Sequence, residues 1–174
     1  MTLTIRKAET SDAKLISVLG TTTFYEAYCE QDDSADLAEY VNEAFNLTQI
    51  ESELNDADST FFIAELGGNA VAYAKLRENS RAECLKDEKA IELQRIYVLR
   101  HIKGKGAGFA LIRKCFEAAR EKDYETIWLG VWEENLAAQG FYKKLGFKRV
   151  GELYFPYGSE VGTNFVLKRE LETA

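Results

Sequence analysis

The segment TIWLGVW, residues 126–132, most constrains what this chain can fold into. It carries no charge, and nearly all of its residues are apolar. A strand of this kind is buried on both faces when it lies inside a sheet that other elements cover on each side. The segment therefore predicts a central strand with a layered α/β architecture around it.

Strand-like and helix-like patterns fill the rest of the chain. Strands are predicted at 2–6, 60–66, 69–78, 91–99, 147–155 and 162–171. Helices are predicted after Thr10–Asp12, from Ser34, after Thr48 with capping-box spacing to Glu51, after a glycine cluster at 104–108, and from Asn135 to Gly146. The charged stretch 78–89 is expected to be a solvent loop. We expect one α/β (α+β) domain over 1–174, with a mixed, mostly antiparallel sheet of about six to seven strands flanked by helices.

Cysteine usage and hydropathy limit the setting in which the protein works. Cys29, Cys84 and Cys115 are odd in number and lack metal-ligand spacing, so we expect reduced thiols in a cytoplasm and no metal site. No segment approaches the roughly twenty apolar residues of a membrane span, and the N-terminus lacks the apolar core of a signal peptide. A membrane is therefore not an expected partner.

Charge is distributed unevenly along the chain. The formal net charge of −7 argues against a nucleic-acid partner. No basic residue lies between Lys14 and Lys75, whereas basic residues dominate from Arg100 to Lys122. Both regions could simply be solvated helix faces. Opposite fields within one small domain also fit two unlike ligands, a cation for the first region and an anion for the second.

The glycine cluster KGKGAG lies between a predicted strand and a predicted helix. Glycines let the backbone approach a ligand, and the N–H groups of the first helical turn favour an anion such as a diphosphate. The dinucleotide-binding pattern fails because Phe109 stands where its third glycine belongs, and the Lys-Ser/Thr ending of a triphosphate loop is absent. A merely tight turn between strand and helix is the alternative.

Two longer runs give the loop a specific context. RIYVLRHIKGKGAGFALIRK and WLGVWEENLAAQGFYKKLGF resemble the two cofactor-binding motifs of the GNAT superfamily of acetyltransferases, over roughly positions 92 to 147. In that family the loop reads Gln or Arg, two residues, Gly, one residue, then Gly or Ala. Lys103, Gly106 and Gly108 stand at the matching positions, and Lys103 keeps the positive charge without the planar fork of Arg.

The resemblance implies acetyl-CoA as cofactor and assigns residues to it. The loop would cradle the diphosphate, and the preceding strand would grip the pantetheine arm through its backbone. Asn135, Ala138 and Phe141 belong to the second motif, and Asn135 is equally well explained as a helix N-cap. The implied cofactor-binding residues are Ile96, Tyr97, Val98, Lys103, Gly104, Lys105, Gly106, Ala107, Gly108, Asn135, Ala138 and Phe141.

Two side chains are candidates for the catalytic proton transfers. Strand alternation puts Glu92 on one face with Gln94, Ile96 and Val98, so Glu92 is the candidate general base, directly or through water. The alternative is a solvated strand residue, or an ion-pair partner of Arg95 or Lys75. Tyr142 matches the family tyrosine that protonates the departing thiolate, and a core aromatic is its alternative. His101, the only histidine, receives no role.

The acceptor amine is expected to contact the first helices. The resemblance implies an acceptor site walled by the acidic region with Phe24, Tyr25 and Tyr28, together with Glu92 and the turn around Tyr154, Phe155 and Tyr157. Carboxylates among aromatic rings suit a small cationic amine, although many of these rings also fit a core.

Further runs, TTTFYEAY and YVNEAFNLTQIESEL among them, resemble the PaiA-type bacterial spermidine and spermine acetyltransferases. That resemblance implies polyamine N-acetylation. A protein or peptide N-acetyltransferase and a non-catalytic acetyl-CoA-binding regulatory module stay open as alternatives. The sequence also leaves a homodimer open.

Overall fold

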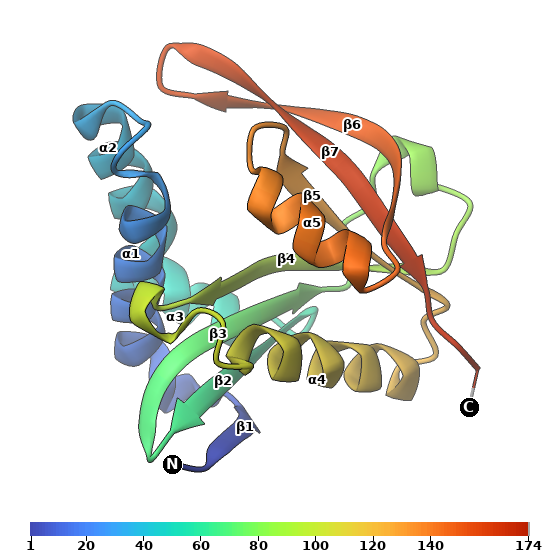
Figure 1. Ribbon diagram of the computed structural model, residues 1–174, viewed down its shortest axis with the longest axis horizontal. Helices are drawn as coiled ribbons and strands as arrows, with labels where there is room; N and C mark the ends of the chain where they lie inside the picture. Colours follow the sequence, from blue (N-terminus) through green and yellow to red (C-terminus); the bar gives the residue numbers. More distant parts are fainter. Residues whose placement is uncertain (174) are drawn as a thin grey trace. The chain divides into compact units, whose positions relative to one another are not determined.

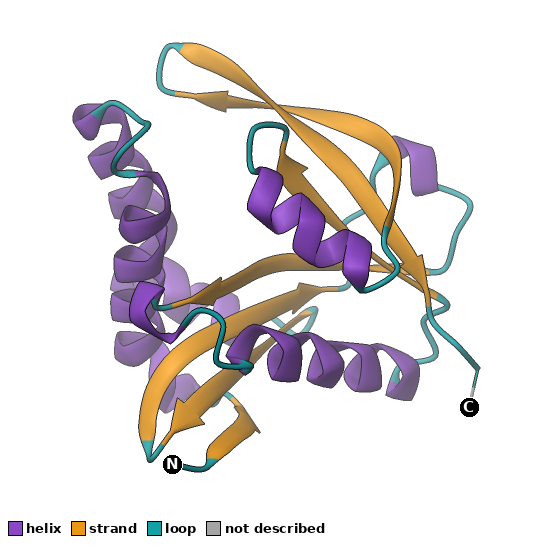
Figure 2. Cartoon of the chain, in the orientation of Figure 1, coloured by secondary structure: helices purple, strands orange, loops and turns teal. Residues whose placement is uncertain are grey.

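The computed structural model describes residues 1–173 (Figure 1, Figure 2). Its strands are β1 Leu3–Lys7, β2 Ser59–Leu66, β3 Asn69–Arg77, β4 Ala90–Val98, β5 Thr126–Trp132, β6 Lys148–Tyr157 and β7 Glu160–Glu170. Its α-helices are α1 Ala13–Tyr28, α2 Ser34–Phe45, α3 Leu47–Asn55, α4 Ala107–Glu121 and α5 Leu136–Lys144. Short 3₁₀ helices are η1 Thr10–Asp12, η2 Glu83–Leu85 and η3 Arg100–Ile102.

The strands form one seven-stranded sheet in the order β1-β2-β3-β4-β5-β7-β6. The β1/β2, β5/β7 and β6/β7 pairs are antiparallel, and β4/β5 is parallel over Ala90–Glu92. A mixed, mostly antiparallel sheet with helices is therefore confirmed. The prediction that TIWLGVW is a central strand is also confirmed, because β5 has a neighbour on each side and is mostly buried.

The chain divides into two compact units, which are described separately. Unit 1 contains Met1–Leu76 and Arg95–Cys115, and unit 2 contains Arg77–Gln94 and the chain from Phe116 onward. The boundaries fall inside β3, β4 and α4, so each of these elements contributes residues to both units. The expectation of a single domain over 1–174 stays a prediction.

In unit 1 the helices α1, α2 and α3 pack on one another. Gly20 on α1 makes close packing possible, because a Cβ at this position would lie 2.4 Å from the Phe45 ring. Asp33 caps α2, and Asn46 caps α3 by accepting a hydrogen bond from the Gln49 N–H at 2.9 Å. The predicted cap at Thr48 is therefore wrong, since the helix begins before that residue.

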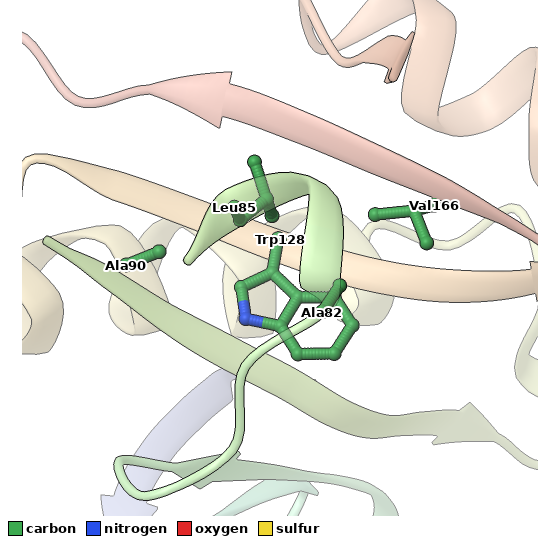
Figure 3. Packing of buried hydrophobic residues seen from close by; sticks show 5 residues of the cluster. All are labelled: Ala82, Leu85, Ala90, Trp128 and Val166. Atoms are coloured by element: carbon green, nitrogen blue, oxygen red, sulfur yellow. The ribbon is translucent and has the colours of Figure 1, made fainter. Parts of the chain in front are cut away.

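In unit 2 the antiparallel β6/β7 hairpin turns at Gly158, which has a φ of 57° (Figure 1). The expectation that 78–89 is a solvent loop is wrong for its middle. Ala82 and Leu85 are buried against Trp128 on β5 (Figure 3). The charges around these two side chains concealed them, although burying an apolar pair is favourable.

No helix in the described chain, residues 1–173, has both the length and the apolar character needed to span a membrane. Within the same range, no group of three or more His, Cys, Asp or Glu side chains is arranged to hold a metal ion.

Candidate active site

The predicted glycine loop follows η3 in unit 1 and leads into α4. Gly104 and Gly106 have φ values of 80° and 89°, which lie in the left-handed region that favours glycine. A Cβ added at either glycine would meet nothing within 4 Å. The backbone here is therefore open, and the N–H groups of the first turn of α4 have no partner inside the helix.

The surroundings of this loop favour an anion. The side chains of Lys103 and Lys105 are exposed beside the two glycines, and the positive end of the α4 dipole lies at the same place. Ala107 is buried and fixes the start of the helix. An extended anion such as a diphosphate could lie against the backbone while both lysines reach it. His101 is exposed on η3.

The end of β4 leads from the sheet to the loop. Ile96, Tyr97 and Val98 are half-buried, and they lie beyond the residues that pair with β5. The Tyr97 ring stacks on Tyr73 with centroids 6.1 Å apart. Burial raises the pKa of Tyr97 well above its ordinary value, so its hydroxyl stays protonated. This end of β4 is thus packed through its side chains in unit 1.

Phe24 stands at the centre of an aromatic cluster that reaches β4. Its ring lies 4.6 Å from Tyr28, 4.6 Å from Tyr40 and 6.0 Å from Tyr97. Burial raises the pKa of Tyr28, and a hydrogen bond with Tyr97 opposes part of that rise. Phe24 is itself a buried core residue, as the alternative interpretation of these aromatics allows.

Tyr25 projects differently from its neighbour Phe24. It is 55% exposed and lines a shallow groove of about 400 Å³ between α1 and α2. The groove is lined by Ser17, Thr21, Tyr25, Leu37, Ala38, Val41, Asn42, Phe45 and Asn46. The structure therefore separates the predicted acceptor aromatics into Phe24 and Tyr28 on one side of α1 and Tyr25 on another.

Part of the acidic region is already paired with basic residues. Glu26 accepts a hydrogen bond from the Arg100 backbone N–H at 2.8 Å, and Glu30 lies 3.4 Å from the Arg100 guanidinium. Glu53 is held by Arg95 at 2.6 Å and by Lys75 at 3.0 Å. These contacts reduce the negative field that the sequence predicts, and most of the acids that stay exposed belong to α2 and its flanks.

The buried pairing at Glu53 affects its pKa. Burial alone would raise that pKa, but the hydrogen bonds and charge of Arg95, a hydrogen bond from Gln49 and the charge of Lys75 together outweigh burial and lower the pKa below its ordinary value. The guanidinium of Arg95 also lies over the Phe45 ring, 5.1 Å from the centroid. The two cations that the sequence offered as partners of Glu92, Arg95 and Lys75, are therefore bound to Glu53 instead.

Glu92 in unit 2 is buried, with 8% of its surface exposed. Its Oε2 accepts a hydrogen bond from Nε of Arg77 at 2.8 Å and forms an ion pair with Nη2 of the same guanidinium at 2.8 Å. The alternative that Glu92 forms an ion pair is thus confirmed, but its partner is Arg77 and neither of the two cations expected from the sequence. In the register with β5, Glu92 lies beside Trp128.

Glu92 and Arg95, both on β4, bind different partners. Glu92 pairs with Arg77, whereas Arg95 shares the Glu53 carboxylate with Lys75. The common face expected for the even positions from 92 to 98 stays a prediction.

The second motif forms the start and the buried side of α5. Asn135 caps the helix by accepting a hydrogen bond from the Ala138 N–H at 3.1 Å. The Tyr142 ring is buried and packs edge-on against Phe141 and Phe147, with centroids 5.3 Å and 5.5 Å apart. The cap is confirmed, and it leaves the other lone pair of the Asn135 amide oxygen available to a ligand.

The aromatics of the last hairpin differ in exposure. Tyr154 is 70% exposed, and its hydroxyl donates to Glu152 at 3.1 Å. Phe155 lies against Gly162 on β7, where a Cβ would approach its ring to 2.4 Å. Tyr157 is half-buried at the end of β6. All three rings belong to β6 of this hairpin.

The sequence analysis missed two residues beside Glu92. Arg77 lies outside both motifs, and only the pairing of β3 with β4 selects it from three nearby cations. Trp128 is fully buried, and its Nε1–H has no hydrogen-bond partner within residues 1–173. The apolar run around Trp128 indicated burial, but no pattern in the sequence indicated an unpaired donor.

Comparison with known proteins adds the family context. An N-acetyltransferase of Lactobacillus delbrueckii subsp. lactis is 29% identical over 149 residues, covering 86% of each chain. One of Mycobacterium bovis is 31% identical over 135 residues, covering 78% of this chain and 82% of the relative. The crystal structure of the PaiA N-acetyltransferase of Thermoplasma acidophilum in complex with coenzyme A matches with a TM-score of 0.80. The match is 19% identical and covers 98% of this chain and 99% of that one.

The profile of the acetyltransferase (GNAT) family matches residues 21–147, which include the open glycine loop, Glu92 and Tyr142. Because that match spans most of the chain and the fold agrees, this protein belongs to the acetyltransferase (GNAT) family.

Proposed function

We propose that the chain transfers an acetyl group from acetyl-CoA to a primary amine, and that the amine is a polyamine such as spermidine or spermine. The observation that carries the proposal is the open backbone at Gly104 and Gly106, flanked by Lys103 and Lys105 at the start of α4. The similar fold of the PaiA N-acetyltransferase, crystallised with coenzyme A, supports it.

Acetyl-CoA supplies an acetyl group activated as a thioester, so that the amine nitrogen forms an N–C bond as the C–S bond breaks. In this proposal the loop residues Lys103–Gly108 hold the diphosphate through backbone N–H groups. Backbone groups of Ile96 and Val98 hold the pantetheine arm. Ala138 and Phe141 line the cofactor from α5, and the amide oxygen of Asn135 accepts a hydrogen bond from the pantetheine arm while keeping its cap.

Two proton transfers complete the reaction. An alkylamine has a pKa of about 10.4, so it must lose a proton before it can attack, and Glu92 accepts that proton directly or through water. The thiolate that leaves has an ordinary pKa of about 8.5, and the Tyr142 hydroxyl donates a proton to it. Neither step requires a metal ion.

The acceptor proposal is supported by the first helices. Tyr25 is exposed and lines the groove between α1 and α2, and α2 carries exposed carboxylates at Glu39 and Glu43. Rings and carboxylates together attract a flexible polycation through cation–π and Coulomb interactions. Because the carboxylates are exposed, added salt should weaken this attraction.

The activity test measures CoA release with acetyl-CoA and each of spermidine, spermine, an aminoglycoside and a short peptide. We expect the highest kcat/KM with a polyamine, and a decline with rising salt. Preference for the peptide would make the chain a peptide or protein N-acetyltransferase. Binding of acetyl-CoA without turnover on any amine would favour a regulatory module.

The loop itself can be tested with a matched pair of glycine variants. Gly106→Ala strains a left-handed residue and places a methyl group where the diphosphate is proposed to lie. Gly68→Ala in the β2–β3 turn carries the same strain, with φ 84° and equally open space. Calorimetry with CoA should show binding weakened on the order of tenfold or more in Gly106→Ala alone. Equal affinity in both variants would contradict the cradle.

A further inference from the structure

The carboxylate of Glu92 is held by only one of its oxygens. Nε of Arg77 donates a hydrogen bond to Oε2 at 2.8 Å, and Nη2 forms an ion pair with the same oxygen at 2.8 Å. Within residues 1–173, no protein group donates a hydrogen bond to Oε1. Hydrogen bonds from a guanidinium to a carboxylate are strong and directional, so they fix the rotation of the Glu92 side chain. One oxygen is engaged and the other is left to accept a proton.

Arg77 is itself held in place at its far end. Its Nη2 donates to Oγ of Ser80 at 3.1 Å, so the guanidinium is fixed on two sides. Ser80 lies in the segment 78–89, whose first residue, Glu78, is held by two contacts. Glu78 binds Lys122 at 2.7 Å and accepts from the Tyr124 hydroxyl at 3.2 Å.

The rest of that segment is anchored as well. Leu85 is buried against Trp128, the residue beside Glu92 in the β4/β5 register (Figure 3). Glu88 accepts from Thr126 at 3.0 Å and from Lys168 at 2.6 Å. A segment held at its start, middle and end keeps Ser80 in place, and therefore holds the guanidinium before any ligand binds.

From this geometry we infer that Arg77, held by Ser80, is the positioning residue that presents Oε1 of Glu92 as the proton-accepting atom of the acetyl transfer. The inference rests on the proposed role of Glu92 as general base. An N–H bond of the ammonium group breaks as its proton moves to Oε1, directly or through one water, and the neutral nitrogen then forms its bond to the acetyl carbon. Arg77 keeps its own protons and touches no reacting atom.

The test compares Arg77→Gln, Arg77→Lys, Ser80→Ala and Glu92→Gln with the wild-type full-length chain. Turnover is followed by CoA release with acetyl-CoA and spermidine, or with whichever amine of the panel gives the highest turnover. Arg6→Gln is the matched control, because Arg6 is similarly exposed and also binds a carboxylate, that of Glu65, at 2.8 Å. Circular dichroism and calorimetry with CoA verify that each variant is folded.

We expect kcat of Arg77→Gln to fall on the order of ten- to a hundredfold with little change in KM, a part of the full effect of a general base. Free guanidinium ion, added well below the concentrations that unfold the protein, should restore part of that loss. Arg77→Lys should keep more activity than Arg77→Gln. Ser80→Ala should lose less activity than Arg77→Gln. Combined with Glu92→Gln, the Arg77→Gln change should cost nothing further.

Three results would overturn the inference, and they can be told apart. If Glu92→Gln is as active as wild type, the proposed base fails and the positioning role fails with it. If Glu92→Gln loses activity while Arg77→Gln does not, the base stands and only the positioning role is lost. If the two losses are additive and guanidinium restores nothing, Arg77 has a structural role only.

Discussion

Tyr142 combines a packing role with the proton transfer that we propose for it. Its ring is fixed between Phe141 and Phe147, so the direction of its hydroxyl is set by the helix and by the aromatic contacts. A proton donor held in this way loses little conformational entropy during the reaction. The two interpretations of Tyr142 are therefore compatible, because the ring packs in the core and the hydroxyl is the proposed acid.

Tyr142→Phe removes the hydroxyl and keeps the ring. We expect the fold and the affinity for CoA to be unchanged, and kcat to fall on the order of a hundredfold because the thiolate must leave unprotonated. Steady-state kinetics of CoA release measures the effect. Tyr73→Phe is the control, since Tyr73 is a fully buried tyrosine whose hydroxyl has no hydrogen-bond partner within residues 1–173. Undiminished turnover in Tyr142→Phe would remove the acid assignment.

For single residues, predictions from sequence were correct where the role of the residue depends only on its neighbours along the chain. Asn135 caps its helix as predicted, because a cap depends only on the next three residues. The partner of Glu92 could not be predicted in this way. Arg77, Lys75 and Arg95 are all cations on strands near it in the chain, and the choice among them depends on strand register and on competition from Glu53.

Among the elements, the segment 78–89 departs most from its sequence pattern. Its charges suggested a solvent loop, yet η2 turns Ala82 and Leu85 toward Trp128 (Figure 3). Two apolar residues three apart in a polar stretch give too little periodicity for a prediction. The long strands and helices were predictable because each repeats its pattern over two or more turns or pleats.

Leu85→Ala should destabilise unit 2. Removing a fully buried leucine costs about 2 to 5 kcal/mol, and the lower end applies here because η2 can partly collapse onto Trp128. Urea denaturation gives the change, and limited proteolysis should show new cleavage within 78–89. Leu136→Ala, at a leucine that is 74% exposed on α5, should change the free energy of unfolding by less than about 0.5 kcal/mol. Equal effects in the two variants would contradict the burial of η2.

For the whole molecule, the sheet order was less predictable than the elements in it. The hairpins β2–β3 and β6–β7 follow from their glycine turns, and the apolar character of β5 predicts its central place. The insertion of β7 between β5 and β6 has no local signal, because it depends on pairing across distant parts of the chain. Composition and periodicity do not carry that information.

Stability should depend on pH through Glu53. Its pKa is lower in the folded protein than the ordinary 4.5, so its contribution is complete above that value and is lost as the pH falls below it. Glu53→Gln leaves the buried Lys75 and Arg95 without this carboxylate, which should cost about 3 to 5 kcal/mol at pH 7. The difference from wild type should shrink as the solution is acidified.

Urea unfolding at a series of pH values measures the cost of Glu53→Gln and its dependence on pH. Glu51→Gln is the control, because Glu51 is an exposed residue of the same helix and its change removes the same charge. Parallel pH profiles for wild type and Glu53→Gln would show that Glu53 does not carry this dependence.

The position of Trp128 has an optical consequence. The protein contains two tryptophans, Trp128 and Trp132, and both belong to β5. All indole fluorescence therefore originates from a single strand. The Trp128 chromophore is buried against apolar side chains that include Leu85 of η2, where emission is shifted to shorter wavelength, so the emission wavelength reports whether η2 covers that strand.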